Sequence, residues 1–70
     1  MNSKLSFKLI ARKNGLSTYE VRTVGSSTLA GTVEKRISTG EVYWLGRYND
    51  GTAAYAADTR IDAAWALINS

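Results

Sequence analysis

The chain of 70 residues is long enough for one small domain, and we expect residues 1–70 to form it. It contains no cysteine and no histidine, which removes disulfides, the usual zinc ligands and the commonest general base. Nine Lys and Arg against six Asp and Glu give a formal charge of +3. That mild basic excess permits nucleic-acid binding but lacks the charge density of a strong non-specific binder.

Neither a membrane span nor a secretory signal is predicted. No apolar run approaches the ~20 residues that cross a bilayer. Residues 1–8 alternate polar and apolar side chains, where a signal peptide needs an unbroken apolar stretch. We therefore expect a cytoplasmic protein that does not bind membranes.

The first part of the chain predicts a β-hairpin. Residues 5–12 alternate apolar and polar side chains with the period of a half-buried strand. Asn14-Gly15 follows, and this pair is a strong signal for a two-residue hairpin turn. Residues 17–24 are rich in β-branched side chains and predict a second strand, after which 25–27 predict a loop.

Three further strands are predicted at 29–37, 41–48 and 52–57, with turns at 38–40 and 49–51. Period-two alternation gives the third strand one face made of Leu29, Gly31, Val33 and Lys35. The same alternation gives the fourth strand one face made of Val42, Trp44, Gly46 and Tyr48. The fifth strand is short and rich in alanine, so we expect it to be the weakest.

The last dozen residues predict a capped amphipathic helix. Thr59 is a good N-cap, and Asp62, three residues on, favours the positive end of the helix. One stripe of the helix is formed at spacings of three and four by Ile61, Ala64, Trp65 and Ile68. We expect Trp65 to be the central core residue, packed on the sheet near Trp44 and Val33.

These elements predict an α+β fold in which an antiparallel sheet of four or five strands packs against one C-terminal helix. The first two strands either extend this sheet or cover its second face in a barrel-like arrangement. No enzyme is expected, because the carboxylates are scattered, no histidine is available for a triad and no glycine-rich phosphate loop is present. No cofactor and no metal site are expected either.

The face opposite the helix is the candidate site. If Val33, Trp44, Gly46 and Tyr48 point to the helix, alternation leaves on the other face Thr32, Glu34, Arg36, Tyr43, Leu45 and Arg47. The arginine forks suit phosphates and guanine edges, and Tyr43 can stack or hydrogen-bond. Glu34 lies in the middle of the same face and would repel phosphate. A Tyr, Leu and Arg patch with a polar rim also fits a protein interface.

The second half of the chain resembles a known DNA-binding family over residues 31–68. The motifs are the strand from Gly31 to Arg36, the run from Tyr43 to Gly51, and the Thr59-Arg60 start of an alanine-rich helix. Together they resemble the N-terminal arm-type DNA-binding domain of phage and transposon tyrosine integrases. The resemblance implies three strands on one helix, as in the ethylene-response-factor type of domain. It also implies a sheet that enters the major groove and basic contacts at Lys35, Arg36 and Arg47.

Two functions follow as alternatives. The first is a small accessory protein, of phage or mobile-element type, that binds double-stranded DNA through Lys35, Arg36, Arg47, Tyr43 and Arg22. The second is a protein-binding module or inhibitor of a host protein that acts through Tyr43, Leu45 and the sheet edge. A homodimer formed by pairing of the exposed fifth strand is a third possibility.

Overall fold

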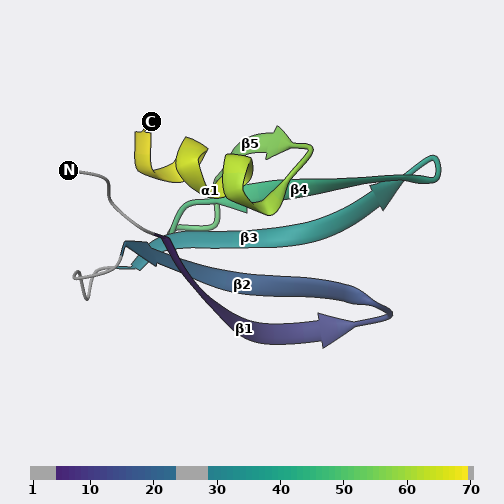
Figure 1. The fold of residues 1–70 in the computed structure, drawn as a ribbon, viewed down its shortest axis with the longest axis horizontal. Coiled ribbons are helices and arrows are strands. Elements are labelled where there is room, and N and C mark those ends of the chain that lie inside the picture. Colours follow the sequence, from purple (N-terminus) through teal and green to yellow (C-terminus); the bar gives the residue numbers. More distant parts are fainter. Residues whose placement is uncertain (1–4, 24–28, 70) are drawn as a thin grey trace.

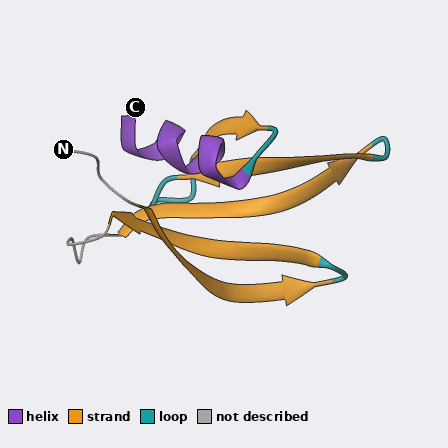
Figure 2. Cartoon of the chain, in the orientation of Figure 1, coloured by secondary structure: helices purple, strands orange, loops and turns teal. Residues whose placement is uncertain are grey.

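A computed structural model describes residues 5–23 and 29–69 of the chain. The elements in chain order are β1 (Leu5–Lys13), β2 (Leu16–Thr23), β3 (Leu29–Ser38), β4 (Glu41–Arg47), β5 (Ala53–Ala57) and α1 (Arg60–Asn69). All neighbouring strands pair antiparallel in the order β1-β2-β3-β4-β5, and α1 lies against β3, β4 and β5 (Figures 1 and 2). The predicted α+β fold is confirmed. Val24 and the predicted loop at 25–27 lie outside the described residues.

The first two strands extend the sheet and do not cover it. β2 pairs with β3 from Thr18↔Glu34 to Val21↔Gly31, and β1 then pairs with β2 at the edge. In Figure 1 the β1–β2 hairpin diverges from the β3–β4 hairpin toward their tips. The sheet face opposite α1 is therefore uncovered by any described element.

The predicted hairpin turns are confirmed, and backbone geometry explains them. Asn14 and Gly15 have φ angles of 55° and 79°, and Thr39 and Gly40 have φ angles of 49° and 82°. Positive φ at both central residues belongs to the turn whose twist matches that of antiparallel strands. Asn14 and the two glycines tolerate this left-handed conformation readily, whereas the β-branched Thr39 adopts it at a steric cost.

The core lies between the sheet and α1 and is built from small side chains. Val21 and Val33 are fully buried beneath Ala63, Ala64 and Leu67 of the helix. Two glycines, Gly31 and Gly46, let the helix approach the sheet closely. A Cβ at Gly31 would collide with the carbonyl oxygen of Arg47, and one at Gly46 would lie 3.0 Å from the carbonyl oxygen of Ala63. At Gly46 the helix backbone therefore lies directly against the strand, and at Gly31 the Leu67 side chain does so, 3.2 Å from where a Cβ would stand.

This close approach corrects the predicted helix stripe. Ala64 and Ile68 pack on the core as expected, but Ile61 is 53% exposed and Trp65 is only half-buried and lies outside the core cluster. Ala63 and Leu67 are buried in the core where Ile61 and Trp65 were expected. The expectation that Trp65 is the central core residue was wrong, because the helix buries Ala63, Ala64 and Leu67 against the sheet and Trp65 lies beside this face.

A register shift corrects one predicted position in β3. The pairing of β2 with β3 is irregular between Val21 and Arg22, so that Ala30 forms an extra residue in β3. Gly31 and Val33 lie on the core face as predicted, but Ala30, and not Leu29, packs against the core. A bulge of this kind reverses the alternation beyond it, and the alternation alone could not reveal it.

Arg60, in the first turn of α1, contacts the β1–β2 hairpin at the edge of the sheet. Its guanidinium carbon lies 4.3 Å from the ring centre of Phe7 and 4.8 Å from that of Tyr19. The two rings meet edge to face, and Tyr19 continues the row to Trp44 at 6.0 Å. The N-cap of α1 is confirmed, because the Asp62 amide donates to Thr59 Oγ1 at 3.1 Å.

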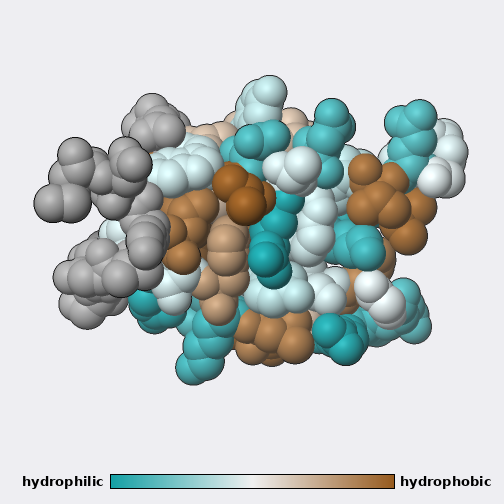
Figure 3. Space-filling view, viewed as in Figure 1, coloured by the Kyte–Doolittle hydropathy of each residue, from teal (hydrophilic) through white to brown (hydrophobic). Residues whose placement is uncertain are grey.

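The end of the β3–β4 hairpin extends beyond the helix and exposes apolar side chains. Ile37 pairs with Val42 across this hairpin, and the two are 56% and 47% exposed. Figure 3 shows apolar surface at this end of the molecule, separated from other apolar areas by polar atoms.

Within residues 5–23 and 29–69, no helix has the length and apolar character needed to cross a membrane.

Candidate nucleic-acid interface

The face opposite α1, here called the open face, contains the side chains that alternation predicted for β3 and β4. Three cross-strand pairs form its centre: Thr32↔Arg47, Glu34↔Leu45 and Arg36↔Tyr43. Directly opposed residues in a sheet project to the same side, so the six side chains lie together. Val33 and Gly46, which alternate with them, are buried under the helix.

The first hairpin adds further polar side chains to the open face. In β2, Thr18 pairs with Glu34 and Glu20 pairs with Thr32, and Arg22 alternates with Glu20 on the same side. In β1, Lys8 pairs with Glu20 and Lys13 pairs with Leu16. The cations of the open face are Lys8, Lys13, Arg22, Arg36 and Arg47. The carboxylates are fewer and consist of Glu20, Glu34 and Glu41.

Glu34 is the centre of an ion-pair network on this face. Its Oε1 accepts a hydrogen bond of 2.6 Å from Arg47 Nε, and its Oε2 lies 3.3 Å from Arg36 Nη1. The Glu34 side chain is 23% exposed, compared with 35% for Arg47 and 44% for Arg36. The carboxylate predicted to repel phosphate is therefore neutralised by two arginines.

The two arginines differ in how tightly they are held. Arg47 is bound at two positions, because its Nη1 also donates to the carbonyl oxygen of Gly51 at 3.0 Å. Among the described residues, Arg36 has only the 3.3 Å contact to Glu34, which exceeds the usual length of a charge-assisted hydrogen bond. Arg47 is thus a fixed group, and Arg36 is the group whose donors are free to turn toward a ligand.

Arg22 lies at the far side of the open face and also has an acidic partner. Its Nη1 donates to Glu20 Oε1 at 2.9 Å, with both side chains partly exposed. A guanidinium carries five N–H donors, so one such bond leaves most of them available. Each arginine of the open face is therefore held by a carboxylate and retains donors for a ligand.

Tyr43 and Leu45 lie among these charges, and both are half-buried. Tyr43 faces Arg36 across the β3–β4 ladder, and Leu45 lies between Glu34 and Ala56 of β5. The polar neighbours and the neighbouring strands reduce the exposure that sequence reasoning assigned to these two side chains.

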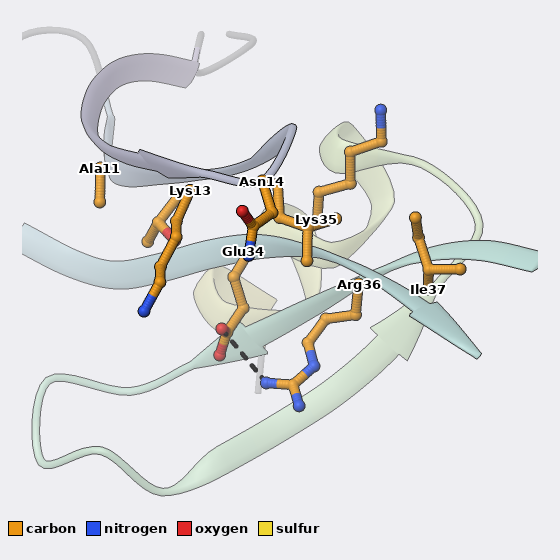
Figure 4. Close-up of a pocket in the computed structure, with 9 residues that line it drawn as sticks. Ala11, Lys13, Asn14, Glu34, Lys35, Arg36 and Ile37 are labelled. Carbon is orange, nitrogen blue, oxygen red and sulfur yellow. Dashed lines mark hydrogen bonds and ion pairs between the residues drawn. The ribbon is translucent and has the colours of Figure 1, made fainter.

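Lys35 does not join the other predicted contacts. It alternates with Glu34 and Arg36 and pairs with Trp44, which packs against the core cluster. In Figure 4 its side chain points away from the side to which Lys13, Glu34 and Arg36 point. The structure therefore brings together Arg36, Arg47 and Tyr43, with Arg22 at the border, and leaves Lys35 on the other face.

Sequence reasoning missed two lysines of the open face. Alternation in β1 could have predicted Lys8, because it places this residue on the face opposite the half-buried Leu5 and Phe7. Alternation could not have predicted Lys13, because the pairing of β1 with β2 shifts between Leu9 and Ala11. No ion pair involves either lysine within residues 5–23 and 29–69.

A hollow of about 310 Å³ lies in the gap between the two hairpin ends (Figure 4). Its walls combine polar and apolar side chains from both hairpins. They are Ala11, Lys13, Asn14, Leu16, Thr18, Glu34, Lys35, Arg36 and Ile37. The hollow exists because the β2–β3 pairing ends at Thr18↔Glu34 while both hairpins continue.

The turn beside Arg47 is ordered by its own hydrogen bonds. The Thr52 amide donates to Asp50 Oδ1 at 2.8 Å, and this bond holds the pKa of the Asp50 carboxyl below its ordinary value. Asn49 Nδ2 donates to the carbonyl oxygen of Leu29 at 2.6 Å. No group of three His, Cys, Asp or Glu suited to a metal ion occurs in the described part of the chain.

Comparison with known proteins gives this chain no relatives. No family model, no curated protein and no solved structure matches it.

Proposed function

We propose that this protein is a small accessory DNA-binding protein that binds double-stranded DNA through the open face of its sheet. The observation that supports this most is the convergence of cations from four strands on one uncovered face. Lys8 and Lys13 come from β1, and Arg22, Arg36 and Arg47 come from β2, β3 and β4. Cations spaced over one face can neutralise several phosphates, and the released counterions then favour binding.

The ion pairs on this face are compatible with that role. A carboxylate that holds one edge of a guanidinium restricts its rotation and leaves its other donors directed outward. Glu34 does this for Arg47, whose remaining N–H groups are available to a phosphate or a guanine edge. The β3–β4 hairpin is a two-stranded ribbon with Arg36 and Tyr43 on one side, and the major groove admits an element of that width.

Fluorescence anisotropy of a labelled duplex of mixed sequence, titrated at two salt concentrations, tests the proposal. We expect binding that weakens steeply as salt rises. Replacing Arg22 and Arg36 by Gln together should reduce the slope of log K against log salt by about two. The matched control replaces Arg12 and Lys35, which lie on the other face, and should retain the wild-type slope. Equal losses in both double variants would contradict binding by the open face.

A protein partner is the second candidate, and the closed Glu34 network favours it. Arginines already paired with a carboxylate carry less net charge to DNA, while half-buried Tyr43 and Leu45 present apolar area inside a polar rim. In that case Leu45→Asp would abolish capture of the partner, and added salt would weaken the complex much less than it weakens a DNA complex.

A further inference from the structure

The hollow between the two hairpin ends has the charge of an anion site. Lys13 reaches it from the β1–β2 hairpin and Arg36 borders it from β3, against the single carboxylate of Glu34. Lys35 also lines the hollow, but its side chain points to the other side of the strands. Figure 4 shows the side chains of Lys13 and Arg36 on the same side of the strands, with Glu34 between them. The cations of two separate hairpins thus face one space.

Glu34 does not cancel this charge, because its strongest bond is to a residue outside the hollow. Arg47 holds Oε1 at 2.6 Å and does not line the hollow. Arg36 contacts the other oxygen at 3.3 Å only, so an incoming anion competes with a long bond. When Arg36 turns toward a ligand, Glu34 keeps its partner and is not left as an unpaired charge.

We propose that this hollow binds a phosphate group, with Lys13 and Arg36 as its two cationic ligands. The inference rests on the proposed function, since a backbone phosphate of DNA is one source of the group, and a free phosphorylated ligand is the other. A phosphate presents oxygens in several directions, which suits cations that approach from opposite walls better than the two coplanar oxygens of a carboxylate do. Asn14 and Thr18, whose side chains carry N–H and O–H donors, also line the hollow.

The site can be tested without DNA by titrating the ¹⁵N-labelled protein with pyrophosphate and following its NMR spectrum. We expect saturable shifts of the Thr18 amide and of the Lys13 and Arg36 side-chain signals. The shift of the Thr18 amide should be lost in Lys13→Gln and in Arg36→Gln. Arg12→Gln is the matched control, because it removes the same charge next to Lys13 in the chain but on the other face. Equal losses in all three variants, or no saturable shift in the wild type, would overturn the site.

A parallel anisotropy titration with duplex DNA separates the two sources of phosphate. If DNA supplies the group, Lys13→Gln and Arg36→Gln should each reduce the salt slope by about one, while Arg12→Gln leaves it unchanged. Pyrophosphate binding without DNA binding would support the site, assign it to a free phosphorylated ligand and refute the proposed function. DNA binding whose slope falls with Arg36→Gln but not with Lys13→Gln, together with no pyrophosphate shifts, would refute the site and leave the proposed function standing.

Discussion

The face of the sheet under α1 and the open face opposite it differ in the side chains that form them and in the forces that hold them. Under the helix, small residues allow the backbones to approach, and Val21 and Val33 are fully buried. On the open face, long side chains pair through charges, within β2 and β3 and across from β3 to β4, and stay partly exposed. The comparison indicates that stability resides mainly in the covered face, so that the open face can change with little effect on folding.

The largest expected effect is at Gly31. Its φ of 155° and the closeness of the Arg47 carbonyl leave no space for a Cβ. Gly31→Ala should cost about 3 kcal/mol or more, a large share of the roughly 5–15 kcal/mol of a typical domain. Gly40→Ala is the matched control, since Gly40 also has positive φ but no atom near its Cβ position. Chemical denaturation measures both, and equal losses would contradict close packing at Gly31.

The next effect separates Leu67 from Trp65, two large residues of the helix. Leu67→Ala should cost about 2–4 kcal/mol, because this buried side chain contacts the sheet over Gly31 and Gly46. Trp65→Ala should cost roughly 1 kcal/mol or less, since the indole is half-buried outside the core cluster. Thermal melts of the two variants would contradict the described packing if Trp65→Ala were the more damaging.

A smaller effect is expected at Arg60. Arg60→Ala removes the cation–π contacts to Phe7 and Tyr19, and it should cost about 1 kcal/mol. The loss should concentrate in β1 and β2, because Arg60 joins this hairpin to the helix. Relative to wild type, hydrogen exchange in Arg60→Ala should accelerate more for the β1 and β2 amides than for the β3 and β4 amides. Arg12→Ala, an exposed cation of β1, is the control and should change neither.

The smallest effects compare the two arginines of the Glu34 network. Arg47→Ala should cost about 1 kcal/mol, because it removes two hydrogen bonds and leaves a half-buried carboxylate with its weaker partner. Arg36→Ala should be within about 0.5 kcal/mol of wild type, since its single bond is long and exposed. Urea midpoints measured on both variants test this order. A reversed order would identify Arg36, and not Arg47, as the fixed group.

Local sequence signals predicted the elements well because each signal acts within a few residues. Asn14-Gly15 predicted its turn, Thr59 its cap, and period-two alternation the open-face positions of Glu34, Arg36 and Arg47. These features depend on backbone preferences and on spacing, both of which can be read from the chain.

Features that depend on register or on distant contacts could not be read in the same way. The bulges at Ile10 and Ala30 decide which side Lys13 and Leu29 take. Gly31 beside the second bulge is a weak signal of it, and no residue signals the first. The contact of Arg60 with Phe7 joins opposite ends of the sequence. The size of Trp65 suggested a core role, whereas the helix face that meets the sheet is formed by Ala63, Ala64 and Leu67, with Leu67 over the two glycines.

The most direct test of DNA binding by the open face is NMR mapping of the ¹⁵N-labelled protein with an unlabelled duplex. We expect the largest amide shifts at Thr18, Thr32, Arg36 and Leu45, with the amides of Ala63 and Ala64 in the helix nearly unchanged. Shifts centred on α1, or a spectrum unchanged by the duplex at low salt, would contradict the account and direct the search to a protein partner.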